Sequence, residues 1–177
     1  MPVTSLQTAM SDILAVVGAA LDAHQGANDF PAGCTVPARR YVAHSEPAWD
    51  CDTLAVYWSP VDTSNPLRGR PTGGDCAVLG GVAVHIQLVL CDAPVENPAG
   101  QPGSAPSPAQ WNTFTACLNA QAWAMWCAVA DAAYTKTLYS EQEACEQVAI
   151  INMNPLGPQG GIAGVDMLLW IDLPCTT

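Results

Sequence analysis

Hydrophobic residues in this chain repeat with two different periods, and the order of the periods limits the possible folds more than any other feature. Residues 5–24 predict a helix, because apolar side chains recur there at the spacing of one helical face. A second helix is predicted to begin at Ser107-Pro108-Ala109-Gln110, where serine can cap the helix, proline fits its first turn and glutamine completes a capping box. The first apolar face consists of Leu6, Met10, Ile13, Leu14, Val17 and Leu21.

Apolar residues that alternate with period two predict five strands. The order is helix, three strands, helix, two strands, which indicates one α+β domain over residues 1–177. We expect an antiparallel sheet of about four to five strands with two helices on one face. The predicted strands are 41–44, 53–58, 77–91, 148–153 and 164–173; long Pro/Gly-rich loops are predicted at 59–75 and 92–107, and a turn-rich loop at 154–161.

The surface of such a domain has few charged groups to cover it. Only 12% of residues are charged, 50% are hydrophobic, and 16 acidic residues face 5 basic ones, for a net charge of −11. Large bare apolar patches on a soluble protein promote association, so we expect copies of the chain to cover one another. The acidic balance also argues against binding nucleic acid through its phosphates.

The second predicted helix carries two apolar stripes, and a helix that is apolar on two sides is covered on two sides. One stripe should meet the sheet, and the other should meet the first helix or a neighbouring subunit. Aromatic residues are enriched at interface hot spots. The candidate interface residues are therefore Trp111, Trp123 and Trp126, together with Arg68 and Arg70 at the tip of the 59–75 loop.

Eight cysteines are present, and no CxxC or CxxH pair occurs among them, so no metal site is expected. The N-terminus lacks the pattern of a signal peptide, and no run of about 18 apolar residues predicts a membrane span. We expect folding in the cytosol with reduced thiols, and Cys117 and Cys127 as small core residues of the second helix. One or two bridges among Cys51, Cys76, Cys91 and Cys175 are the alternative, if the finished particle leaves the cell.

No local pattern pairs a nucleophile with a base. His24, His44 and His85 are the only histidines, and each is expected to be a surface or a hydrogen-bonded buried side chain. Two carboxylates beside Cys51 lack the oxygen spacing of a calcium site. The glycine pairs lack the lysine and spacing of phosphate-binding loops. We therefore expect no enzyme activity, no catalytic residues and no cofactor.

Two short segments, together with the order of elements, resemble a known family. They are Arg39-Arg40-Tyr41 with Trp49-Asp50-Cys51, and the glycine- and proline-rich stretch 155–164 before the last strand. The chain resembles the tail terminators, head–tail joining or neck proteins of siphophages that infect actinobacteria. The resemblance implies a hexameric ring in the virion that caps the tail tube and docks onto the head-side connector, assembled in the host cytoplasm without contact with a membrane. The family has no catalytic residues to carry over.

A ring of this kind would need a lumen through which genome DNA passes without specific binding. Acidic side chains repel phosphate, so Asp50, Asp52, Asp166 and Asp172 are expected to line it. Another connector, such as a stopper or head-completion protein, is the alternative within the same class. A small hydrolase that uses Cys or His, or a small ligand-binding module of the host, are the alternatives from other classes.

Overall fold

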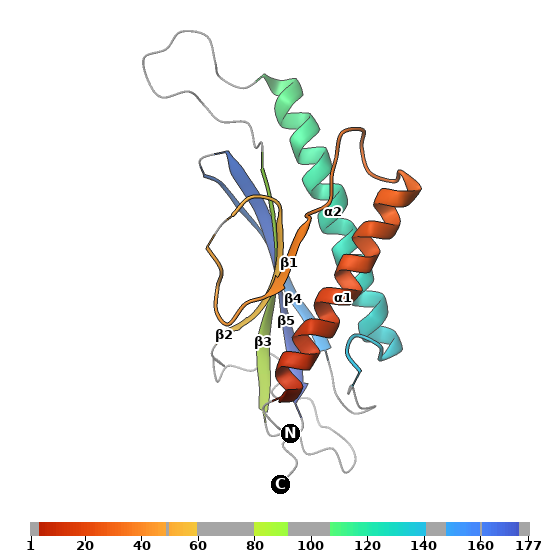
Figure 1. Ribbon diagram of the computed structural model, residues 1–177, viewed down its shortest axis with the longest axis vertical. Coiled ribbons are helices and arrows are strands. Elements are labelled where there is room, and N and C mark those ends of the chain that lie inside the picture. The colour runs from red at the N-terminus through yellow and green to blue at the C-terminus, as the bar shows by residue number, and fades with distance from the viewer. Residues whose placement is uncertain are drawn as a thin grey trace.

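The computed structural model describes residues 4–48, 50–59, 80–91, 107–140, 148–159 and 161–173, in which two helices cover one face of a five-stranded sheet (Figure 1). The α+β class, the strand number and the placement of both helices on one face agree with the sequence prediction. Most of the 59–75 and 92–107 loops lies outside the described residues. The elements are α1 (Thr4–Ala27), β1 (Arg39–Val42), β2 (Thr53–Ser59), β3 (Gly80–Leu90), α2 (Pro108–Thr135), β4 (Val148–Gln159) and β5 (Ile162–Leu173).

The sheet is mixed, which corrects the expectation of a purely antiparallel one. Its strand order is β1-β2-β3-β5-β4, and every neighbouring pair is antiparallel except β1 and β2, which run parallel. Residues 43–52 connect these two strands and are long enough to return the chain to its starting end. A parallel neighbour cannot be joined by a tight hairpin, and the sequence contains no hairpin turn at this point.

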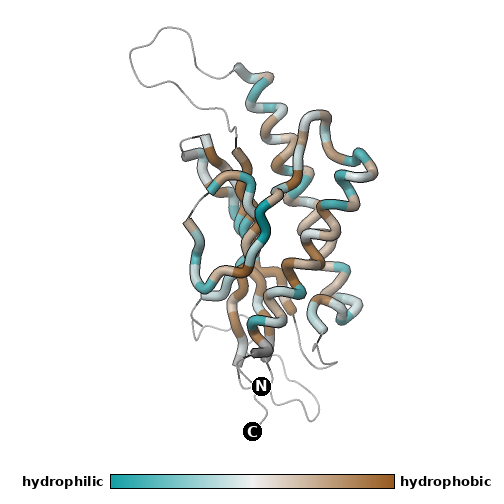
Figure 2. The backbone as a smooth tube through the Cα atoms, in the orientation of Figure 1, coloured by the Kyte–Doolittle hydropathy of each residue, from teal (hydrophilic) through white to brown (hydrophobic). Residues whose placement is uncertain are grey.

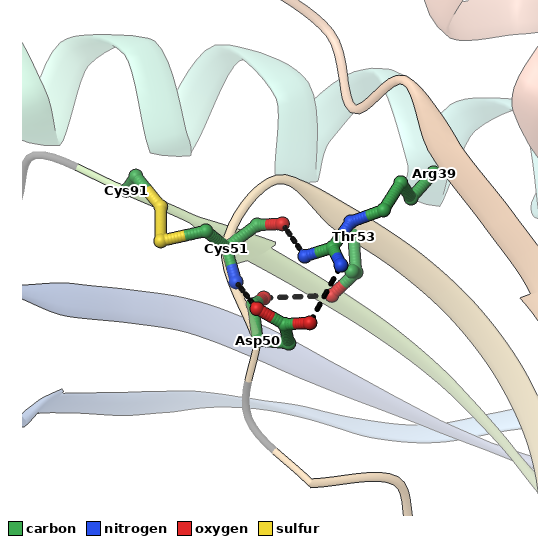
Figure 3. A network of polar contacts seen from close by, with 5 residues as sticks. All are labelled: Arg39, Asp50, Cys51, Thr53 and Cys91. Carbon is green, nitrogen blue, oxygen red and sulfur yellow. Dashed lines mark hydrogen bonds and ion pairs between the residues drawn. A yellow bond between two sulfur atoms is a disulfide. The ribbon is translucent and has the colours of Figure 1, made fainter.

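Two consecutive arginines hold the short edge strand β1 in place. Arg40 forms two hydrogen bonds of 2.7 and 2.6 Å with the carboxylate of Asp22 on α1, beside Gly18, where a Cβ atom would lie 2.9 Å from Nη1 of Arg40. Arg39 binds the Asp50 carboxylate at 2.6 Å and also donates to the Cys51 carbonyl (Figure 3). Both arginine side chains therefore link β1 to neighbouring segments, in addition to its ladder with β2.

The hydrophobic core lies between the two helices and the sheet face that they cover, and Figure 2 shows apolar segments on these facing elements. Fully buried side chains come from α1 (Ile13, Leu21), from the sheet (Leu54, Ile86, Leu88, Met167, Leu169) and from α2 (Met125). Among the described residues, Leu6–Ala27 is the one helical stretch long and apolar enough to span a membrane, although the sequence led us to expect none. About a third of this stretch is buried, and its buried residues include Ile13, Val17 and Leu21 of the core.

Local signals set the start of α2 and the end of β4. The predicted capping box is present, because Ser107 accepts from the Gln110 backbone and the Gln110 side chain accepts from Ser107. The predicted 154–161 loop is wrong for most of its length, since β4 continues to Gln159 and pairs Pro155 with Val165. An edge strand can hold a proline, because one of its sides has no ladder that needs the missing N–H.

The close approach of β5 to β3 at Gly164 gives a first test. A Cβ atom at Gly164 would lie 2.1 Å from the Leu88 carbonyl oxygen, whereas one at Gly26 of α1 would meet nothing within 4 Å. We expect Gly164→Ala to lower the free energy of unfolding by about 1–3 kcal/mol through overpacking. Gly26→Ala should be neutral or stabilising by up to about 1 kcal/mol. Urea unfolding of both variants measures the contrast, and equal stabilities would contradict the described register.

The Asp22–Arg40 pair predicts a pH dependence. The hydrogen bonds from Arg40 hold the pKa of Asp22 in the folded protein below its usual value. The pair therefore stabilises the fold fully at pH values above the unfolded-state pKa of Asp22, and this stabilisation is lost as pH falls through the lower folded-state pKa. Asp22→Asn should therefore be less stable than the wild type at pH 7, with a difference that shrinks toward pH 2. Asp131→Asn, on the exposed side of α2, serves as the control, and a pH-independent deficit for Asp22→Asn would contradict the pairing.

Candidate functional site

A connected set of polar side chains lies on the sheet face that the helices leave free. It contains Ser59 of β2, His85 of β3 and Asp166 of β5, which are three neighbouring strands. The strand register explains the grouping. Tyr57 lies opposite His85 and Gln87 lies opposite Asp166, so Ser59 and Asp166 are diagonal neighbours of the imidazole on its two sides.

The two nitrogens of the His85 ring have different partners. Nδ1 lies 2.8 Å from Oδ2 of Asp166, and Nε2 lies 3.2 Å from Oγ of Ser59. A carboxylate can only accept, so Asp166 fixes the proton on Nδ1 and leaves Nε2 to accept from the Ser59 hydroxyl. This is the order of contacts by which a serine is activated in acyl-transfer enzymes.

Burial and stacking hold the imidazole in this position. The Tyr57 ring stacks on the His85 ring with centroids 4.7 Å apart and an interplanar angle of 6°. Tyr57, Gln87 and Asp166 are buried, and the His85 side chain is 18% exposed. Burial, followed by the nearby Asp166 charge, raises the pKa of Tyr57, so its phenol stays protonated at neutral pH. The imidazole is therefore held by buried neighbours on several sides.

The sequence predicted only that His85 would be a surface or satisfied residue, and it placed Asp166 at the lumen of a ring. The Asp166 side chain is 12% exposed and faces His85, so it offers little of its carboxylate to a lumen. Ser59 lies 26 positions and Asp166 lies 81 positions from His85 in the sequence, so no local motif could have revealed the group. Only the correct strand order brings them together.

The other predicted lumen residues lie in different surroundings. Asp50 is exposed and is paired with Arg39. Asp52 is exposed and accepts a hydrogen bond of 3.3 Å from the Cys91 backbone. Asp172 pairs with Gly81 along the β5 backbone, while its side chain is not among those described. The four acids therefore form no single cluster among the described side chains.

The predicted interface tryptophans separate into exposed and packed ones. Trp123 is 66% exposed on α2, and Tyr134, about three helical turns later on the same side, is 88% exposed. Trp126 packs partly against the core, and Trp111 is half-buried. Arg68 and Arg70 lie outside the described residues. We call the exposed side of α2 the outer stripe; its members are Asn112, Ala116, Asn119, Trp123, Cys127 and Tyr134.

Two disulfides, Cys34–Cys117 and Cys51–Cys91, correct the expectation of reduced thiols. Their Cα–Cα distances of 5.6 and 5.1 Å suit bridged cysteines. Cys117 therefore ties α2 to the loop after α1. Cys127, also expected in the core, is a free and exposed thiol because it lies on the outer stripe.

A cavity of about 510 Å³ lies where both bridges meet, between the 32–35 loop, the ends of the central strands and the first half of α2. Phe114 and Leu90 are among its apolar lining residues, and Asp52 also lines it. Both cysteines of the Cys34–Cys117 bridge line the cavity. Cys91 of the other bridge lines it as well. The cavity lies away from the His85 network, so the two are separate features.

Comparison with known proteins adds no assignment. The sequence matches no protein-family model and no curated protein. Within the ranges that the structure describes, no group of three or more His, Cys, Asp or Glu side chains is placed to hold a metal ion.

The two bridges give a test of stability. They close loops with sequence separations of 83 and 40 residues, and each should contribute about 2–4 kcal/mol by restricting the unfolded chain. We expect Cys34→Ser with Cys117→Ser to lower the free energy of unfolding by this amount under oxidising conditions. Cys127→Ser, on an exposed thiol, should change it little. Peptide mapping without reductant that finds either pair unlinked would contradict the pairing.

Proposed function

We propose that this chain is a structural virion protein that forms a ring at the head–tail junction of a phage, where it terminates the tail tube and joins it to the head connector. The observation that carries self-association is the outer stripe of α2. It presents the rings of Trp123 and Tyr134 to solvent on a chain with few charges. Exposed aromatic rings of this size are typical of surfaces that another chain covers.

A closed ring requires two different patches on each copy, one for each neighbour. The outer stripe is one patch. The outer edge of β4 is a second, since no other described strand pairs with it and Ile151 at its bulge is 38% exposed. An unpaired edge of 12 residues also risks uncontrolled pairing, which a neighbouring subunit would prevent. These two surfaces support head-to-tail contacts between copies.

The placement at a phage neck rests on the resemblance described above. In support of it, the quoted Arg39-Arg40 and Asp50-Cys51 segments contact each other through the Arg39–Asp50 ion pair, so they form one structural unit. Asp50 and Asp52 are both exposed beside β1 and β2, and a ring that turned this edge inward would present acid to passing DNA. Tail tube and head-side proteins are the proposed partners, with no specific DNA binding and no membrane contact.

The disulfides are compatible with a virion that is assembled in the host cytoplasm. Cytosolic thiols stay reduced, and disulfides persist outside the cell. The bridges would then form in released particles. A stopper or head-completion ring remains the alternative within the class, and the neighbour that the ring contacts in a particle distinguishes the two.

Substitution within the outer stripe tests the association. We expect Trp123→Ala combined with Tyr134→Ala to weaken self-association at least tenfold while the melting temperature stays within a few degrees, because both rings are exposed in the protomer. Sedimentation velocity across a concentration series measures the association. His44→Ala, an exposed ring between β1 and β2, is the matched control and should associate like the wild type.

Cys127 provides an independent readout of the same surface. It lies one turn from Trp123 on the outer stripe, so contact with a neighbour should slow its reaction with a maleimide. We expect labelling of the Cys127 peptide, followed by mass spectrometry, to be slower at high protein concentration than at low. A wild type that stays monomeric at high concentration, with equal labelling at both, would exclude the ring.

A further inference from the structure

The geometry points to a second activity: we propose that Ser59 is a nucleophile that accepts acyl groups from small uncharged esters, with His85 as its base and Asp166 as the residue that orients the base. This inference concerns the sheet face opposite the helices and does not depend on ring formation. It rests on two hydrogen bonds: Nδ1 of His85 donates to Asp166 at 2.8 Å, and the Ser59 hydroxyl donates to Nε2 of His85 at 3.2 Å.

The orientation of the base is set from several sides. Asp166 fixes the Nδ1 proton, and the stacked Tyr57 ring fixes the plane of the imidazole. A base whose tautomer and plane are both held can take a proton without first reorganising. Oδ1 of Asp166 and Nε2 of Gln87, which lie on paired residues, have no hydrogen-bond partner among the described residues.

Ser59 lies where a substrate can approach its hydroxyl. It is the last residue of β2 and is only partly buried, in contrast to Asp166 and Gln87 deeper in the network. Across the sheet its direct neighbour is Ala83, and Ala83 in turn lies opposite Trp170. The small Ala83 methyl group beside the hydroxyl favours an apolar acyl group. The net charge of −11 disfavours anionic esters.

The proposed reaction balances without a cofactor. The Ser59 oxygen bonds to the ester carbonyl carbon while its proton moves to Nε2 of His85. Collapse of the tetrahedral adduct breaks the bond to the alcohol oxygen, and that alcohol leaves with the proton from His85. Water, deprotonated by the same nitrogen, then attacks the acyl-serine; the bond from the carbonyl carbon to the Ser59 oxygen breaks, that oxygen takes the proton from His85, and the carboxylic acid leaves.

A fluorophosphonate probe tests the nucleophile directly, because the serine oxygen displaces fluoride and forms a stable bond to phosphorus. The wild-type chain is incubated with the probe, and peptide mapping measures the rate of modification at each serine. We expect Ser59 to react roughly 100-fold faster than Ser140, the gain typical of a positioned base. Ser140 is a matched internal control, since its hydroxyl donates to the Asp12 carboxylate at 2.7 Å.

Variants separate a nucleophile from a merely structural serine. His85→Gln should lower the Ser59 rate roughly 100-fold, and Asp166→Asn should lower it as well. Ser140→Ala should leave it unchanged. Hydrolysis of p-nitrophenyl acetate should show the same ranking and disappear in Ser59→Ala, a variant whose small side chain preserves the fold. Melting curves accompany each measurement. Should any substitution at His85 or Asp166 unfold the chain, the comparison of Ser59 with Ser140 in the wild type decides alone.

Two results would overturn the inference. One is labelling of Ser59 no faster than that of Ser140 in the folded wild type. The other is an unchanged Ser59 rate in folded His85→Gln, which would make the serine reactive without its base. Neither result bears on the ring, because the outer stripe belongs to α2 and the network belongs to the other face of the sheet.

Discussion

The pairing of β3 with β5 is the constraint on which the rest of the structure depends. Eleven consecutive residue pairs, from Gly80 with Leu173 to Leu90 with Ala163, run without a register shift. A slip of one residue would exchange the two faces of a strand. This single register places Ile86 and Met167 under the helices and, on the other face, Gln87 beside Asp166. The core and the polar network are consequently two products of the same alignment.

Much of the architecture could be predicted from sequence because its signals are local. The capping box at Ser107 is encoded by four consecutive residues. The burial of Ile13 and Leu21 follows from the helical periodicity of the apolar residues. What could not be predicted depends on partners far along the chain. The parallel edge strand β1 depends on Arg40 reaching Asp22, and β4 tolerates Pro155 only because it is outermost.

The candidate sites also depend on partners that lie far apart along the chain. Alternation correctly set His85 apart from the apolar side chains of β3, but no pattern indicated that its ring nitrogens would meet Asp166 and Ser59. The sequence likewise could not predict that Trp123 is exposed while Trp126 packs against the core, because both lie on one apolar stripe of the second predicted helix. Contact with α1 and the sheet decides which ring is covered. Long-range geometry, and not composition, thus determines which residues are available for chemistry or association.

The two disulfides are nested, since the Cys51–Cys91 loop lies wholly inside the Cys34–Cys117 loop. The inner bridge also joins the start of β2 to the end of β3, which are already adjacent in the sheet. A protease that cut the backbone once between Cys51 and Cys91 would therefore leave both fragments covalently joined by two linkages. In oxidising surroundings the protein could lose chain continuity there without losing either fragment.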